Sequence, residues 1–187
     1  NVFQQVKELE KESAPLSHSV ATKQRVPYNL QTAISAERLE EIGDAFINVP
    51  EGFSVHPRVK PILESRYRMT REGKVDWAMA ELLSWGSLLQ EGRDIRIAGE
   101  DSCRGTFTQR HAIIVDRKNS NIYSPLRAIA QTHGGHFDIY NSSLSEFAGL
   151  GVEYGYSVAH TDALVCWEAH RQWCTNYCRR VRFLRGG

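Results

Sequence analysis

The chain has 187 residues, 41% of them hydrophobic and 24% charged, which is typical of a globular domain and excludes collagen-like, disordered and coiled-coil classes. Its 23 basic and 22 acidic residues nearly cancel, so the strong positive charge of a protein that binds nucleic acid by counterion release is absent. No apolar run reaches the roughly 18 residues that a membrane span needs. Four cysteines do not form a disulfide framework, so we expect a reduced, cytoplasmic protein.

The first part of the chain, residues 1–72, is predicted to be a helical connecting region. Residues 1–28 are charged and interrupted by proline, and indicate a frayed helix followed by a linker. Apolar side chains at helical spacing predict a helix over 35–47, which ends before Pro50. A further helix is predicted over 59–71, ending at Gly73.

From Val75 onward the pattern changes to alternating helices and strands. A helix is predicted from Asp76, which can cap it, to about Gln90, and we expect Trp77 and Trp85 on this helix to lie in the core. Strands are predicted over 94–98, 112–116, 137–140 and 163–167, with a helix over 143–154. This order predicts the α/β class, with a mainly parallel sheet flanked by helices, over residues 73–169.

Ligands of such sheets bind beyond the carboxyl ends of the strands, so we expect the site in the loops 99–111 and 141–146. The first loop holds carboxylates, guanidiniums, hydroxyls and an imidazole between two apolar strands. One interpretation is a pocket for an anionic substrate, with arginine binding a carboxylate and His111 acting as acid, base or donor. The alternative is a polar loop whose charges satisfy one another, with Asp101 paired to Arg104 or Arg110.

Glu146 is the second candidate residue, and it too has two interpretations. Ser143 to Glu146 matches a capping box, in which Ser143 is the N-cap and Glu146, three residues later, bonds back to the backbone. A glutamate at the start of a helix beside the sheet could instead contact a ligand.

A weaker pattern lies near the end of the chain, where a cysteine, a histidine and two further cysteines recur at intervals of four. Such a spacing can bind zinc if the tail is helical, but no supporting turn or capping residues accompany it, and we predict no metal site there. The residues are Cys166, His170, Cys174 and Cys178.

Three long motifs together resemble the 2-oxoglutarate dehydrogenase family, the thiamine diphosphate-dependent first component. They are VDWAMAE with GSLL (75–81 and 86–89), GEDSCRGTFTQRHAIIVDR (99–117) and YNSSLSEFAGLGVEYGYSVAHTDALVCWEA (140–169). The GTFTQRH segment is most similar to the multifunctional form of the enzyme. VPEGF and VHP, in residues 49–57, are similar to the region that precedes the pyrimidine-binding domain.

The resemblance implies a specific chemistry. Such enzymes bind thiamine diphosphate between two domains, and this chain covers the domain that takes the aminopyrimidine, while the diphosphate and Mg²⁺ bind the other. By analogy Glu146 is the carboxylate that bonds the pyrimidine ring nitrogen, and His111 contacts the substrate, 2-oxoglutarate, or an intermediate. Arg104 and Asp101 shape the substrate loop, in which Cys103 departs from the longer residues usual in the family. Implied partners are a second copy of the enzyme, an acyltransferase and lipoamide dehydrogenase.

After residue 169 the chain departs from the family, which continues with an aromatic stretch beside the pyrimidine. Codons that encode the present tail can, one nucleotide further on, encode a family-like sequence. We therefore expect residues 170–187 to be an aberrant tail produced by a frameshift, whether in the gene or in its sequencing. If the tail arises from a frameshift, the regular spacing of its cysteines is accidental, which weakens the zinc interpretation.

The leading hypothesis is a fragment of a thiamine-dependent 2-oxoglutarate dehydrogenase that has no turnover alone, because the half that binds diphosphate and Mg²⁺ is missing. The alternative is a non-catalytic module that associates with the full-length enzyme. A small hydrolase that uses His111 is disfavoured, since no nucleophile lies in a suitable turn. A sheet that stops after its last predicted strand would leave an edge and an apolar face open to association.

Overall fold

The structure is a computed structural model that describes residues 31–143 and 145–169. From Ile34 onward the described residues belong to one compact unit. Its elements are α2 (Ala36–Ile47), α3 (Lys60–Glu72), α4 (Trp77–Gln90), β1 (Ile95–Gly99), β2 (Ile114–Val115), β3 (Ile122–Tyr123), α5 (Pro125–His133), β4 (Phe137–Asn141), α6 (Glu146–Ala159) and β5 (Leu164–Glu168). Among these residues every helix is too short or too polar to span a lipid bilayer.

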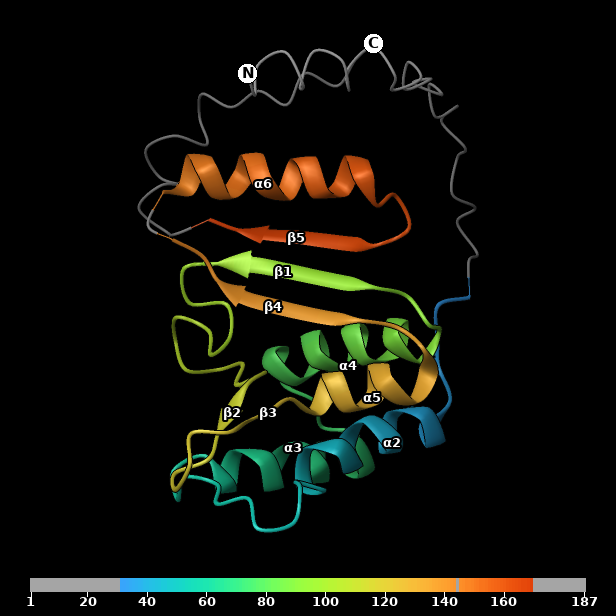
Figure 1. The fold of residues 1–187 in the computed structure, drawn as a ribbon. Helices are drawn as coiled ribbons and strands as arrows, with labels where there is room; N and C mark the ends of the chain where they lie inside the picture. Colours follow the sequence, from blue (N-terminus) through green and yellow to red (C-terminus); the bar gives the residue numbers. More distant parts are fainter. Residues whose placement is uncertain (1–30, 144, 170–187) are drawn as a thin grey trace, which may run out of the picture. The chain divides into compact units, whose positions relative to one another are not determined.

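The main sheet has three parallel strands in the order β4-β1-β5. The last residues of the three strands, Gly99, Asn141 and Glu168, lie in register. Figure 1 shows α6 on the β5 side of this sheet and α4, α5 and α2 on the β4 side. The predicted α/β class with a parallel sheet flanked by helices is therefore confirmed.

One apolar core joins the sheet to the helices on the β4 side. Its fully buried members include Ile42 and Phe46 of α2, Leu82 and Leu89 of α4, and Ile97 of β1. The helices predicted as a connecting region thus pack into the same core as the α/β part, across residue 72, where we placed a domain boundary. That boundary stays a prediction.

The helix ends follow from capping chemistry. Asp76 accepts a hydrogen bond from the Met79 amide at 2.7 Å, so α4 begins where the sequence predicted. α3 ends at Gly73, whose φ of 71° is left-handed backbone that glycine adopts without strain. The helix α5 was not predicted, although Ser124 caps it and Pro125 occupies its first position, both ordinary signals of a helix start.

Two expectations about this region were wrong. Trp77, expected in the core, is 92% exposed because it is the first residue of α4 and lies outside the buried stripe, whereas Trp85 is buried as expected. The strand predicted over 112–116 shrinks to β2, which pairs antiparallel with β3 and not with the main sheet. The flanking residue Asp116 instead accepts backbone hydrogen bonds from Ser54 and Lys118, which tie down the turn after β2.

Candidate active site

The two loops expected to form the site do meet at the carboxyl edge of the sheet. The Ser142 amide donates to the Gly99 carbonyl at 2.7 Å, and the Cys103 amide donates to Oδ1 of Asn141 at 3.0 Å. A side chain at Gly99 has no space, because its Cβ would lie 2.6 Å from Oγ of Ser102 and 2.7 Å from the Glu168 carbonyl. The close approach of the two loops to β5 thus depends on this glycine.

Glu146 is the first residue of α6. The helix is capped by Ser145, whose hydroxyl accepts from the Ala148 amide at 3.4 Å. The predicted capping box from Ser143 is therefore wrong: the helix begins two residues later than that motif requires, and Glu146 stands at its first position. The side chain is half-buried and its Oε2 atom is inaccessible to solvent, so the carboxylate does not point into bulk water. The positive end of the helix dipole favours a negative charge there.

Asp101 and Arg104 form the turn that opens the first loop. The Asp101 carbonyl accepts from the amides of Arg104 and Gly105, and the two side chains form an ion pair at 3.4 Å. Both side chains are more than a third exposed, so the pair adds little stability. Of the two partners considered for Asp101, the structure selects Arg104.

His111 closes the same loop and is 9% exposed. Its φ of 46° is left-handed backbone, which is costly for a residue with a β-carbon. Its Nε2 atom is buried and has no hydrogen-bond partner among the described residues. Burial and the charges of Arg66 and Arg104 lower the pKa of the imidazole, which is therefore neutral at pH 7.

The imidazole faces a cavity of about 340 Å³. His56, Arg104 and Arg117 also line this cavity, with Asp116 as the acidic residue in its wall. Three basic residues around an imidazole whose Nε2 atom has no hydrogen-bond partner among the described residues are suited to an anionic ligand. The structure thus brings Asp101, Arg104 and His111 together in one loop, whereas Glu146 is not among the residues that line this cavity.

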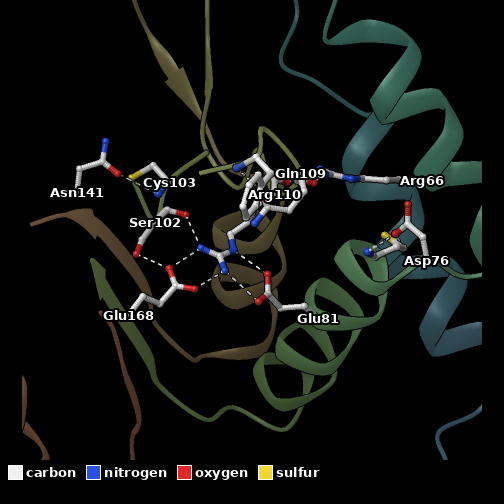
Figure 2. Close-up of polar contacts among 11 residues, drawn as sticks. Arg66, Asp76, Glu81, Ser102, Cys103, Gln109, Arg110, Asn141 and Glu168 are labelled. Atoms are coloured by element: carbon white, nitrogen blue, oxygen red, sulfur yellow. Dashed lines mark hydrogen bonds and ion pairs between the residues drawn. The ribbon is translucent and has the colours of Figure 1, made fainter. Parts of the chain in front are cut away.

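Arg110, beside His111, is the centre of a polar network that the sequence analysis missed (Figure 2). Its guanidinium bonds both oxygens of Glu81, at 2.7 and 2.9 Å, and both oxygens of Glu168, at 2.7 and 2.5 Å. It also donates to the Ser102 carbonyl, and the Ser102 hydroxyl donates to Glu168. The partners lie 29 and 58 residues away in the chain, so no local spacing could have indicated them.

Within this network Arg110 and Glu168 hold each other in their charged forms. Burial lowers the pKa of Arg110, but the hydrogen bonds and charges of Glu168 and Glu81 outweigh it, and the net shift is upward. Burial raises the pKa of Glu168, but Arg110 and Ser102 outweigh that effect and leave the net pKa below its ordinary value. Arg110 therefore ties the loop to α4 through Glu81 and to the end of β5 through Glu168.

The two cysteines in the part of the chain that the structure describes, Cys103 and Cys166, lie in surroundings that disfavour the thiolate. Burial raises the pKa of the Cys103 thiol and of the Cys166 thiol, which disfavours the nucleophilic thiolate. Cys166 lies on the strand β5, not on a helix, and the other members of the zinc pattern lie outside the described residues. Within the part of the chain that the structure describes, no group of three or more His, Cys, Asp or Glu could hold a metal ion.

The fold is a parallel α/β domain in which Glu146 starts the helix that follows β4. The family model of the transketolase pyrimidine-binding domain matches residues 73–179, and the chain belongs to this family. Membership implies thiamine diphosphate as the cofactor of the domain.

The individual relatives are more specific. The chain is 52% identical over 173 residues to the multifunctional 2-oxoglutarate metabolism enzyme of Mycobacterium sp. (strain JLS). It is 50% identical over 171 residues to the 2-oxoglutarate dehydrogenase E1/E2 component of Corynebacterium glutamicum. Each comparison covers 90% of this chain but 14% of the relative, so the chain spans about a seventh of the curated relatives it matches. The predicted resemblance to the multifunctional form is confirmed.

Proposed function

We propose that this chain is the pyrimidine-binding part of a thiamine diphosphate-dependent 2-oxoglutarate dehydrogenase. The reaction is the oxidative decarboxylation of 2-oxoglutarate with transfer of the succinyl unit, a step of the tricarboxylic acid cycle. The observation that carries the proposal is the position of Glu146, whose half-buried carboxylate starts the helix that follows β4, in a domain of the pyrimidine-binding family. The names of the relatives supply the substrate.

The residues present fit the aminopyrimidine of the cofactor. A carboxylate with one oxygen withdrawn from solvent is suited to sharing a proton with a ring nitrogen, because water does not compete for that bond. Thiamine diphosphate, when bound, supplies the electron sink that decarboxylation of a 2-oxo acid requires. The role of Glu146 is to orient the ring and to hold or release the proton at its nitrogen.

We assign the substrate side to His111 and Arg104. The neutral imidazole offers Nε2 as donor or acceptor, and the Arg104 guanidinium, with its side chain 52% exposed, is proposed to bind a carboxylate in the neighbouring cavity. Asp101 holds Arg104 in that loop through their ion pair. The negative charges of 2-oxoglutarate match the basic lining of this cavity.

The diphosphate and Mg²⁺ are proposed, as the resemblance implies, to bind a second domain. On this hypothesis the chain alone has no turnover, because Glu146 cannot replace the binding free energy of the diphosphate and its metal. Decarboxylation of 2-oxoglutarate by the purified chain with thiamine diphosphate and Mg²⁺, above a Glu146→Ala control, would contradict this part of the proposal.

The cofactor role is tested on the chain itself by titrating the ¹⁵N-labelled protein with thiamine diphosphate. We expect amide shifts to change in the loops 99–111 and 141–146, and Glu146→Gln to weaken binding at least roughly tenfold, since it cannot accept the proton. Glu64→Gln is the matched control, because Glu64 is exposed and pairs only loosely, at 4.0 Å, with Lys60. Equal binding by Glu146→Gln and the parent chain would refute the role.

Such a result would favour the alternative, a non-catalytic module that associates with the full-length dehydrogenase; co-purification without cofactor binding would support it directly. The exposed apolar residues of α6 support association in either case. A second copy of the enzyme, an acyltransferase and lipoamide dehydrogenase are the proposed partners, and a cytoplasmic location stays a prediction.

A further inference from the structure

Arg66 is a buried cation in the helix α3, outside the residues that the family model matches. It is 3% exposed, and its guanidinium carbon lies 5.2 Å from the centre of the Phe46 ring. Its Nη2 atom donates to the Gln109 carbonyl at 2.7 Å and also to the Arg110 carbonyl. These two carbonyls immediately precede His111 in the chain.

The peptide that joins Arg110 to His111 is therefore held on both of its edges. Its carbonyl accepts from Arg66, and its amide, that of His111, donates to the Arg104 carbonyl at 3.0 Å. The φ angle of His111 is measured from the plane of this peptide. Holding the peptide in place therefore helps to hold His111 in its left-handed backbone conformation. Strained backbone of this kind persists only where its surroundings over-determine it.

We propose that Arg66 is a positioning residue. It holds the Arg110–His111 peptide, keeps His111 in its left-handed backbone conformation, and so sets the position of the imidazole at the cavity. The importance of that imidazole rests on the proposed function. The positioning itself rests on the hydrogen bonds of Arg66 and on the backbone of His111 alone.

The charge of Arg66 acts on the same imidazole. The ionisable groups that face His111 are Arg66 from α3 and Arg104 from its own loop, and His56, Asp116 and Arg117 line the shared cavity. The carboxylate of Asp116 is engaged by the amides of Ser54 and Lys118. Burial lowers the pKa of Arg66 to about 10, so it is still a cation at pH 7 and disfavours a second positive charge on His111.

The test is an NMR titration of the His111 ring in the full 187-residue chain, which needs neither cofactor nor substrate. In Arg66→Met we expect the pKa of His111 to rise by about half a pH unit or more, because the neighbouring charge is gone. The control is Arg68→Met on the same helix, which is exposed and lines a different cavity, and we expect no change there. A folded Arg66→Met chain with an unchanged pKa would overturn the electrostatic part.

The positional part is tested with Arg66→Lys, which keeps the charge but lacks the planar group that reaches both carbonyls. We expect the pKa of His111 to stay low while hydrogen exchange at its amide accelerates roughly tenfold. This variant also serves if Arg66→Met does not fold. Unchanged exchange at that amide would overturn the proposal, whereas failure of 2-oxoglutarate to perturb His111 in the parent chain would count only against the proposed function.

Discussion

The helices α4 and α6 are both apolar and both 14 residues long, yet the structure treats them differently. α4 buries six residues and packs against α5 and α2. α6 buries a single residue, Glu153, and leaves Phe147, Val152, Tyr154 and Val158 exposed. Its contact with the sheet is made by β5 and β1, and includes the ion pair of Glu153 with Arg96 at 2.7 Å.

The difference separates a helix that packs into the core from one whose large apolar side chains stay uncovered by residues 31–143 and 145–169. Large exposed apolar side chains gathered on one helix mark an interaction surface. Under the proposed function, that surface lies on the helix that also carries Glu146, so association and cofactor binding share one element. Substitutions in α4 should therefore change stability, and those in α6 should change association.

The largest effect is expected for Leu82→Ala in α4. Leu82 is fully buried, so truncation leaves a cavity and should lower the free energy of unfolding by about 3 kcal/mol. Urea unfolding followed by circular dichroism measures it. Phe147→Ala in α6, 76% exposed, is the counterpart and should change stability by less than about 0.5 kcal/mol. Similar losses for both variants would remove the distinction between the helices.

A matched pair of glycines sharpens the comparison. A Cβ at Gly86 of α4 would lie 2.7 to 2.9 Å from the side chain of Ile42, so Gly86→Ala should destabilise by about 1 to 3 kcal/mol. A Cβ at Gly151 of α6 meets nothing within 4 Å, and Gly151→Ala should stabilise the monomer by about 0.5 to 1 kcal/mol through helix propensity. Thermal unfolding of both variants would decide, and opposite signs are the expected result.

Arg110→Gln tests the polar network that connects α4 to β5. The carboxylates of Glu81 and Glu168 are 34% and 40% exposed, so solvent compensates them in part, and we expect a loss of about 1 to 2 kcal/mol at pH 7. The folded-state pKa of Glu168 is depressed, so its stabilising contribution is present above its ordinary value of 4.5 and is lost as the pH falls through the folded pKa.

The parent chain should accordingly lose stability below about pH 4.5, and Arg110→Gln should show a shallower acid dependence over the same range. Unfolding curves recorded between about pH 3 and 7 measure both slopes. Parallel pH profiles for the two proteins would show that Arg110 does not set the pKa of Glu168.

The smallest effect on stability but a clear one on association is expected for Phe147→Ser. Removing the most exposed aromatic side chain of α6 should weaken self-association or binding to the parent dehydrogenase while unfolding changes by less than about 0.5 kcal/mol. Sedimentation velocity over a range of concentrations provides the measurement. Trp77→Ser, at 92% exposure on α4, is the control for exposed aromatic groups in general.

Local signals were sufficient for most elements. Asp76 and Gly73 mark helix ends through hydrogen bonds and backbone angles that depend on adjacent residues alone, and both appear as predicted. The start of α6 was misplaced because Ser143 and Ser145 are equally good N-caps, and only the path of the chain out of β4 selects Ser145. α5 was overlooked although Ser124 and Pro125 mark its start and its apolar residues recur at helical spacing as clearly as those of α2; at nine residues it is the shortest of the described helices.

The site divides in the same way. That the loops after β1 and β4 would meet followed from the geometry of parallel strands, and the motifs themselves were enough to identify Glu146 and His111 as candidates. Other contacts of the site join residues 29 to 58 positions apart. They are the hydrogen bonds of Arg66 to the loop carbonyls and those of Arg110 to Glu81 and Glu168. Such pairings depend on how whole elements pack, because a buried charge takes whichever partners the fold brings within reach, and no local spacing encodes that choice.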